Sequence, residues 1–261
     1  MAKQKKGKTI NTGIDFEFLD NLEGITEGQK IFFQKMNEKI KRANKDEGAD
    51  FNQDDVLIGC PGTGKTFLAI VRALKILSER DGVNKITIVR SAEAGQDVGH
   101  LPGTIGEKTE PFEGGVKNLI NDIMQRGDAY DMLKKKGVIE FILPTHLRSI
   151  TMSGQVIIID EIQNLEEDLL ETIYTRGGDE SYVILCGDYI QSDIKKVSKK
   201  GDVLKFLKTL YEMDNYRPDF YIFGIKDVVR HERIKEYITK KYGEGYSHVY
   251  DEFRKYAAYS S

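Results

Sequence analysis

The run Val56-Leu57-Ile58-Gly59-Cys60-Pro61-Gly62-Thr63-Gly64-Lys65-Thr66 decides the fold of this chain. Its last eight residues satisfy the pattern G-x-x-x-x-G-K-[ST], in which a glycine-rich loop turns successive backbone N–H groups towards an anion. The apolar residues before the loop predict a short buried strand, and those that follow it, from Phe67 to Leu77, recur with helical spacing. The following helix directs the positive end of its dipole at the same anion.

This strand, loop and helix predict a nucleoside triphosphate site. We expect the phosphates to lie against the loop and the first turn of the helix, formed by Cys60, Pro61, Gly62, Thr63, Gly64, Lys65, Thr66 and Phe67. The ammonium group of Lys65 is expected to contact the β- and γ-phosphates as a compact charge, and the hydroxyl of Thr66 to bind Mg²⁺.

A second phosphate-site signal is the run Val156-Ile157-Ile158-Ile159-Asp160-Glu161. Four apolar residues predict a fully buried strand whose carboxyl end delivers two acids to the edge of the sheet where ligands bind. Asp160 is expected to join the Mg²⁺ shell, and Glu161 to act as the general base that orients and polarises the attacking water.

The composition permits an ordinary globular protein with one large domain or two small ones in 261 residues. A net charge of −3 gives no overall attraction to nucleic acid, so a nucleic-acid surface would be a local patch. No run of about 18 apolar residues predicts a membrane span. The basic N-terminus lacks the apolar core of a secretory signal, and two cysteines fit a reducing cytoplasm.

Strand-like runs alternate with helical patterns along the rest of the chain. Strands are expected at 85–90, 138–143, 156–159 and 182–186, with Asp219–Phe223 as the last strand. Helices are expected from Thr26, which forms a capping box with Gln29, and at 115–125, 165–174, 203–211 and 228–242. The Gly- and Pro-containing segment 91–112 is expected to be one long functional loop. The alternation predicts an α/β fold with a parallel sheet covered by helices on both faces.

Phosphoryl transfer also needs positive charge on the γ-phosphate. Three arginines are candidates: Arg148 after the strand end at Leu143-Pro144, Arg176 after the 165–174 helix, and Arg230 in the run Asp227-Val228-Val229-Arg230-His231. We expect at least one of them to complete the site. Gln191 follows the strand end at Gly187-Asp188 and is expected to sense the γ-phosphate or the attacking water.

Taken in order, the segments GCPGTGKT, VRSAEAG, LPG, VIIIDEIQNL, TRGG, VILCGDYIQSDI and DVVRH resemble those of the PhoH family of phosphate-starvation ATPases, in a short form similar to its bacteriophage members. The resemblance covers about 29–242. The chain departs from the family where Arg90-Ser91 replaces an arginine-proline pair and where Ile162 replaces an alanine after the Asp-Glu pair. A third departure is 147–151, which keeps Arg148 but lacks a second basic residue.

The resemblance implies a RecA-like P-loop NTPase core, similar to that of superfamily 1 helicases, with ATP and Mg²⁺ as ligands. It implies that Gln29 reads adenine, that Asp188 and Gln191 form a helicase-like third motif, and that Arg230 lies in the DVVRH motif. We expect a flexible basic arm over 1–24, either solvated or contacting phosphates, a single ATPase domain over 25–245 and a tail over 246–261.

The motifs occur once, whereas a superfamily 1 helicase has two cores. The completing arginine is therefore expected from the same fold or from a neighbouring subunit, and we expect a homo-oligomer, a hexameric ring, with Arg176 or Arg230 acting across the interface. The resemblance to this class of ATPase also implies a strand inserted between the P-loop strand and the Asp-Glu strand, and 182–186 is expected to be that strand. That order would place Cys60 and Cys186 on adjacent strand ends, where oxidation could distort the loop.

By resemblance, ATP hydrolysis is expected to drive a helicase-like motor or remodeller of single-stranded nucleic acid, RNA rather than DNA. Two basic clusters fit this interpretation, namely Lys134, Lys135 and Lys136, and Lys195, Lys196, Lys199 and Lys200. Two alternatives stay open: a P-loop phosphotransferase acting on a small molecule or nucleotide, and a nucleotide-gated assembly factor. Glu161 favours hydrolysis, because such kinases exclude water rather than activate it.

Overall fold

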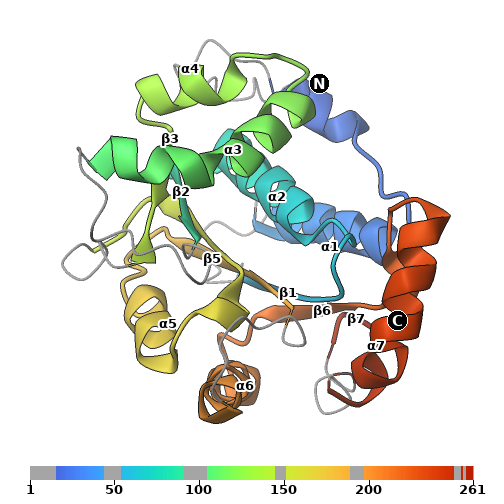
Figure 1. Cartoon of the computed structure of the whole chain (residues 1–261). Helices are drawn as coiled ribbons and strands as arrows, with labels where there is room; N and C mark the ends of the chain where they lie inside the picture. The colour runs from blue at the N-terminus through green and yellow to red at the C-terminus, as the bar shows by residue number, and fades with distance from the viewer. Residues whose placement is uncertain are drawn as a thin grey trace.

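The computed structural model describes residues 16–43, 54–80, 82–90, 105–144, 151–188, 197–249, 254 and 257–260. Seven strands within these residues form one sheet in the order β3-β2-β4-β5-β1-β6-β7, and every strand pair is parallel (Figure 1). The strands are β1 (Asp55–Gly59), β2 (Lys85–Arg90), β3 (Ile139–Ile142), β4 (Gln155–Asp160), β5 (Tyr182–Gly187), β6 (Asp219–Phe223) and β7 (Tyr259–Ser260).

Seven α-helices and three short 3₁₀ helices are described. The α-helices are α1 (Glu27–Ala43), α2 (Lys65–Glu79), α3 (Ile105–Ile123), α4 (Ala129–Lys135), α5 (Glu167–Tyr174), α6 (Val197–Glu212) and α7 (Glu232–Val249). The 3₁₀ helices are η1 (Glu17–Asn21), η4 (Ile162–Asn164) and η6 (Ile225–Asp227). In these parts of the chain no helix is both long and apolar enough to cross a membrane.

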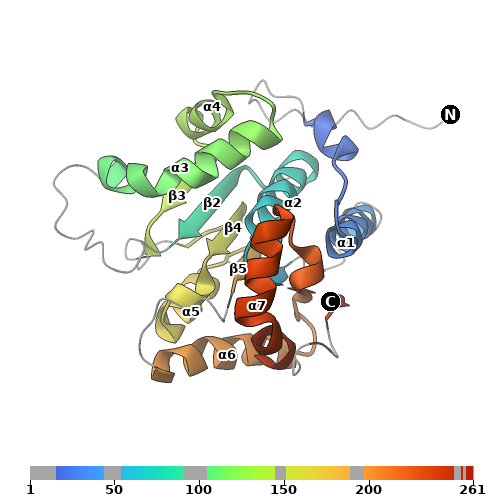
Figure 2. The same cartoon turned by 45° about the vertical axis from the view of Figure 1, so that its right-hand side comes forward.

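The helices cover the sheet on both faces, as the sequence predicted. Figures 1 and 2 show α1 to α4 on one side of the sheet and α5 and α6 on the other. Side chains alternate along each strand, so that Leu57 of β1 packs with α1 and α2 residues such as Phe32 and Leu68, whereas its neighbours Val56 and Ile58 pack with the α5 and α6 side. Two apolar cores therefore sandwich the sheet.

The strand order brings the two predicted motifs to one edge. β5 lies between β1 and β4, as expected, with Leu57 opposite Cys186 and Ile159 opposite Leu185. Because all strands are parallel, the residues that follow β1, β4, β5 and β6 meet at the carboxyl edge of the sheet. The RecA-like P-loop NTPase core is thereby formed, and the P-loop and the Asp-Glu pair share an edge.

Several expected boundaries differ from the structure. The segment 105–112 is helical rather than a loop, since α3 begins at Ile105. The sequence did not indicate this, because Pro111, Gly114 and Gly115 are poor helix residues and interrupt the helical pattern. Helix α7 begins at Glu232 rather than at Val228. The short α4 was not expected.

Two segments outside the expected domain also contribute to the fold. Asp219–Phe223 is not the last strand, because Tyr259–Ser260 adds β7 beside it, within the segment 246–261 expected as a tail. Leu19 of η1, within the expected arm, is buried in the core beside α2, and Asp20 forms an ion pair with Lys75.

Candidate functional site

The P-loop has the backbone conformation that an anion site needs. Gly62 and Gly64 have φ values of 79° and 85°, in the left-handed region that glycine adopts without strain. Helix α2 starts directly after them at Lys65, and its N-cap residue, Gly64, provides no side-chain cap for the first N–H groups. Backbone donors and the positive end of α2 therefore face the loop, which is the arrangement that binds phosphate.

Lys65 lies against this loop. Its Nζ donates to the carbonyl oxygens of Gly59 at 2.8 Å and Cys60 at 3.0 Å. The hydroxyl of buried Thr63 donates to the Cys60 oxygen at 3.0 Å and braces the turn. The ammonium group is thus kept at the loop, where it can act as a point charge on a phosphate.

Thr66 and Asp160 lie next to each other. The Thr66 hydroxyl oxygen is 3.3 Å from each carboxylate oxygen of Asp160 at the end of β4. Burial and the nearby charge of Glu161 raise the pKa of Asp160 to about 6, against the opposing effect of Arg90 and Lys65. A hydroxyl and a carboxylate are the ligands that Mg²⁺ takes in proteins when phosphate oxygens and water complete its shell, so these residues fit Mg²⁺ with a nucleotide.

Glu161 is held in an unusual conformation. Its φ and ψ are 56° and 46°, a left-handed conformation that costs a residue with a side chain about 1–2 kcal/mol. Two side chains hold its carboxylate: Arg90 at the end of β2 lies 3.6 Å away, and the Gln163 amide donates to it at 2.5 Å. Backbone strain of this kind is concentrated at functional sites, and here it occurs at an acid that directly follows a buried strand and keeps 35% of its side chain exposed.

Gln163 links this acid to the neighbouring strand, a role that the sequence analysis missed. Its side-chain oxygen accepts a hydrogen bond of 2.9 Å from the backbone N–H of Asp188, directly after β5. A Cβ atom on Gly187 would lie 2.5 Å from Ile162 and 2.9 Å from that Gln163 oxygen, so only glycine permits the approach. A glutamine two residues after a candidate base was the signal available in the sequence. Gln191 lies outside the described residues.

Arg90 was also missed as a site residue. Its guanidinium lies 3.8 Å from Asp160 as well as 3.6 Å from Glu161, because Arg90 and Asp160 are directly paired in the β2–β4 register. A basic residue at the end of the strand next to the Asp-Glu strand was the signal in the sequence. The positive charge partly balances two adjacent acids.

Gln29 reaches the P-loop from α1. Its side-chain nitrogen donates to the backbone carbonyl oxygen of Thr63 at 3.0 Å, and its side-chain oxygen accepts a hydrogen bond from the Ile25 N–H at 2.9 Å. The Gln29 N–H donates to the Thr26 hydroxyl at 3.3 Å, which is one half of the predicted capping box. The other half is wrong, because the Gln29 oxygen bonds the N–H of Ile25 rather than that of Thr26.

The three predicted arginines lie in different places. Arg230 lies over the P-loop of its own chain: a Cβ atom on Gly62 would be 2.8 Å from Arg230 Cγ and 3.4 Å from its Nε. The Val229 N–H also donates to the Gly62 oxygen at 2.9 Å. Arg176 lies at the opposite, amino edge of the sheet, where its carbonyl accepts from Met152 before β4 begins. Arg148 lies outside the described residues.

The expected approach of the two cysteines is wrong. Both are buried, but Cys60 packs with Val56 and Ile58 in one core, whereas Cys186 packs with Leu57 in the other. Cys186 lies opposite Leu57, three residues before Cys60, so the two side chains leave opposite faces of the sheet at different heights. A disulfide between them would require the backbone to move. Burial also raises the pKa of Cys60 to about 12 and that of Cys186 well above its usual range.

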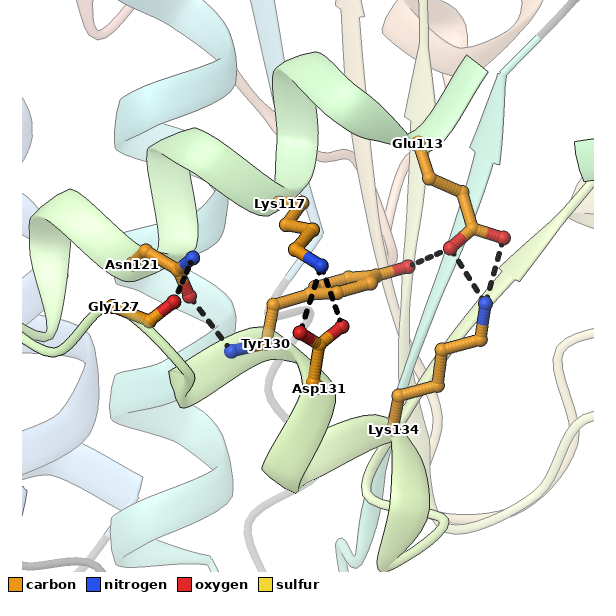
Figure 3. A network of polar contacts seen from close by, with 7 residues as sticks. All are labelled: Glu113, Lys117, Asn121, Gly127, Tyr130, Asp131 and Lys134. Carbon is orange, nitrogen blue, oxygen red and sulfur yellow. Dashed lines mark hydrogen bonds and ion pairs between the residues drawn. The ribbon is translucent and has the colours of Figure 1, made fainter. Parts of the chain in front are cut away.

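One of the predicted basic clusters is partly a structural element. Figure 3 shows Lys134 reaching from α4 to Glu113 on α3, with Nζ–carboxylate distances of 2.6 and 2.8 Å. Glu113 is buried and also accepts a hydrogen bond of 2.8 Å from Tyr130. Lys135 and Lys136 are exposed. Lys195 and Lys196 lie outside the described residues, and Lys199 and Lys200 lie in the first turn of α6.

Comparison with known proteins identifies the family. The family model described as PhoH-like protein matches residues 22–242. The PhoH-like protein of Mycobacterium leprae (strain TN) is 32% identical over 194 residues, which cover 73% of this chain and 53% of the relative. The PhoH-like protein of Bacillus subtilis (strain 168) is 32% identical over 189 residues, which cover 69% of this chain and 56% of the relative. The chain spans about half the length of these curated relatives.

Among solved structures, the large terminase from a thermophilic bacteriophage is 12% identical, with a TM-score of 0.44, and the match covers 79% of this chain and 49% of that one. The sequence resemblance carries the assignment, since the matched range 22–242 spans Gln29, the P-loop, the Asp-Glu pair and the segment around Arg230. The chain therefore belongs to the family of PhoH-like proteins.

Proposed function

We propose that this chain binds ATP with Mg²⁺ at the P-loop and hydrolyses it to ADP and phosphate. The observation that carries the proposal is the convergence of five side chains at the carboxyl edge of the sheet: Lys65 on the loop carbonyls, Thr66 at 3.3 Å from Asp160, and Glu161 held beside Asp160 by Arg90. Mg²⁺ would supply neutralising charge on the phosphates, held by Thr66 and Asp160.

In this proposal the protein residues divide the chemistry between them. Lys65 and the P-loop N–H groups bind the phosphates, and Glu161 accepts a proton from water as the water oxygen attacks the γ-phosphorus and the bond to the bridging oxygen of ADP breaks. Gln29 orients adenine and favours ATP over GTP, since a side-chain amide can both donate and accept hydrogen bonds. Gln191 senses the γ-phosphate or the water.

Arg230 is the arginine that can act within its own subunit, because it already lies over Gly62. Arg176 lies at the other edge of the same sheet, a strand of six residues or about 20 Å away, so only another subunit could bring it to the γ-phosphate. We therefore propose a homo-oligomer, a hexameric ring, in which Arg176 acts in trans; Arg148 is the remaining candidate.

We propose that ATP hydrolysis drives the movement or remodelling of single-stranded nucleic acid, RNA rather than DNA, by this protein. Helix α7, next to Arg230, supports such a surface: Arg233, Lys240 and Lys241 are exposed, and Tyr237 is 59% exposed. The ammonium of Lys241 lies 5.6 Å from the centre of the Tyr237 ring. Basic side chains beside an accessible aromatic ring bind a phosphate backbone and stacked bases.

The test is steady-state ATP hydrolysis with no strand, with single-stranded RNA and with single-stranded DNA, for wild type and Glu161→Gln. We expect stimulation, greater with RNA, and a loss of at least about 100-fold in the variant with ATP binding retained. Hydrolysis that neither strand changes would reject the nucleic-acid partner. Phosphate passed to a small acceptor without hydrolysis would make the chain a phosphotransferase, and full biological activity of the variant would favour a nucleotide-gated assembly factor.

The ring is tested by mixing two inactive variants, Arg176→Ala and Glu161→Gln. If Arg176 acts in trans, an Arg176→Ala subunit, which keeps Glu161, regains activity beside a Glu161→Gln subunit, which keeps Arg176. The ATPase activity of the mixture should therefore exceed that of either variant alone. A monomer at micromolar concentration with full activity would reject the ring.

A further inference from the structure

A buried carboxylate, Asp227, joins three segments that are far apart in the sequence. One oxygen accepts the N–H of Gly28 in the first turn of α1 at 3.1 Å, and the other accepts the N–H of Gly224 after β6 at 3.2 Å. The hydroxyl of Tyr259 on β7 lies 3.2 and 3.1 Å from the two oxygens. Only 1% of Asp227 is exposed, so these partners take the place of water around its charge.

Two of these segments contact the P-loop. Gly28 precedes Gln29, whose side chain bonds the Thr63 oxygen. The turn that begins at Gly224 leads to Val229, whose N–H bonds the Gly62 oxygen, and to Arg230 over Gly62. Asp227 therefore ties together the two segments that touch the loop from either side.

Tyr259 is built into this junction. Strand β7 pairs with β6, with Tyr259 opposite Tyr221, and its ring centre lies 6.0 Å from that of Phe223. A Cβ atom on Gly28 would lie 2.5 Å from the Tyr259 ring and 2.7 Å from Asp227. The ring thus covers α1 at a position that only glycine can occupy.

We propose that Tyr259 is a positioning residue of the nucleotide site: through Asp227 it sets the placement of Gln29 and Arg230 against the P-loop, and so controls the affinity for ATP and its preference over GTP. This inference rests on the proposed ATP-binding function. The nucleotide is not contacted by Tyr259 in this role; the hydroxyl holds the carboxylate that holds the two contacting segments.

The decisive variant is Tyr259→Phe, which removes the hydroxyl and keeps the ring. Direct titration with ATP and with GTP gives dissociation constants that do not depend on turnover. We expect the ATP dissociation constant to rise about five- to tenfold and that for GTP to change less than twofold, so that the ATP preference narrows. The turnover number at saturating ATP should fall less than the affinity.

The matched control is Tyr182→Phe. Its hydroxyl accepts a hydrogen bond from Arg80 at 3.2 Å at the amino edge of the sheet, so the control removes a comparable group away from the P-loop. It should leave both dissociation constants unchanged, whatever its effect on thermal unfolding. A general loss of stability would lower the unfolding temperature in both variants without changing the ATP-to-GTP ratio.

A double-mutant cycle with Asp227→Asn tests the route. If Tyr259 acts through Asp227, adding Tyr259→Phe to Asp227→Asn should cause no further loss of ATP affinity. If wild type binds ATP and Tyr259→Phe binds it equally well, this inference alone would be overturned. Wild type that binds neither nucleotide would overturn the proposed function and this inference with it.

Discussion

Gln163 donates a hydrogen bond of 2.5 Å from its side-chain amide to the carboxylate of Glu161. The same amide accepts the backbone N–H of Asp188 at 2.9 Å, so the proposed base directly after β4 is joined to the end of β5. We therefore expect a displacement of the β5 end to move the carboxylate of Glu161, the proposed base.

Replacing Gln163 with leucine removes both hydrogen bonds, because leucine has a side chain of similar size without the amide. We expect the turnover number for ATP to fall about tenfold, because the base loses its orientation, while the dissociation constant for ATP changes less than about twofold. Gln155→Leu is the control, since Gln155, at the start of β4, is also buried and accepts a hydrogen bond of 2.5 Å from Thr87 of β2. Equal losses of turnover in both variants would contradict the coupling.

The left-handed backbone of Glu161 makes glycine more stable than alanine at this position. We expect Glu161→Gly to exceed Glu161→Ala by about 1 kcal/mol in free energy of unfolding, measured by denaturant titration, because glycine has no Cβ penalty there. Both variants should lose hydrolysis. At Glu171, within helix α5, the order should reverse by a similar amount, since glycine is the poorer helix residue. The same order at both positions would refute the argument from backbone strain.

Arg90 is expected to serve turnover rather than affinity. Arg90→Met removes the charge between Asp160 and Glu161, and we expect a turnover number about tenfold lower with an ATP dissociation constant within about threefold of wild type. Arg90→Lys should be intermediate, because lysine supplies a point charge without the planar fork. Arg80→Met, at the far edge of the sheet, is the control for loss of an arginine. A variant Arg90→Met with normal turnover would remove Arg90 from the site.

The Glu113 network joins α3 to α4 and is expected to contribute to stability alone. Burial tends to raise the pKa of Glu113, but hydrogen bonds from Lys134, Thr109 and Tyr130 outweigh it and lower the pKa. Tyr130→Phe removes one of these bonds, so the free energy of unfolding should fall by about 1–2 kcal/mol with ATP binding unchanged. Tyr237→Phe, on an exposed ring, should leave the free energy of unfolding unaltered.

Asp54 makes stability depend on pH. Desolvation raises the pKa of Asp54 to about 6, although hydrogen bonds from the Val183 N–H at 2.7 Å and the Tyr174 hydroxyl at 3.2 Å oppose this. The folded state therefore binds more protons than the unfolded state between about pH 4 and 6. The free energy of unfolding falls as the pH rises through that window, because Asp54 must ionise while it is buried.

Asp54→Asn removes this titration. The free energy of unfolding of the variant, relative to wild type, should increase between pH 4 and 6 and stay higher up to pH 8, by about 1 kcal/mol for a carboxyl that keeps some contact with solvent. Denaturant titrations across this range measure the difference. The exposed control Asp179→Asn should follow wild type, and an Asp54→Asn curve parallel to wild type would contradict the assignment.

The sequence by itself determined the parallel α/β fold, the P-loop and the placement of Asp160 and Glu161 at its edge. These features depend on short-range signals: the left-handed glycines at 62 and 64, the apolar run before the Asp-Glu pair, and the helical spacing after Thr66. The inserted position of β5 was also predicted, because the family resemblance implies the strand order.

The tertiary structure alone decided which side chains meet. Register and face placed Cys60 and Cys186 in opposite cores, and sheet direction placed Arg176 at the amino edge while Arg230 came to lie over Gly62. The meeting of Tyr259 with Asp227 and Gly28 joins residues up to about 230 positions apart. Local periodicity specifies a strand or a helix within a few turns, whereas such contacts depend on how the finished layers pack, which no short stretch of sequence encodes.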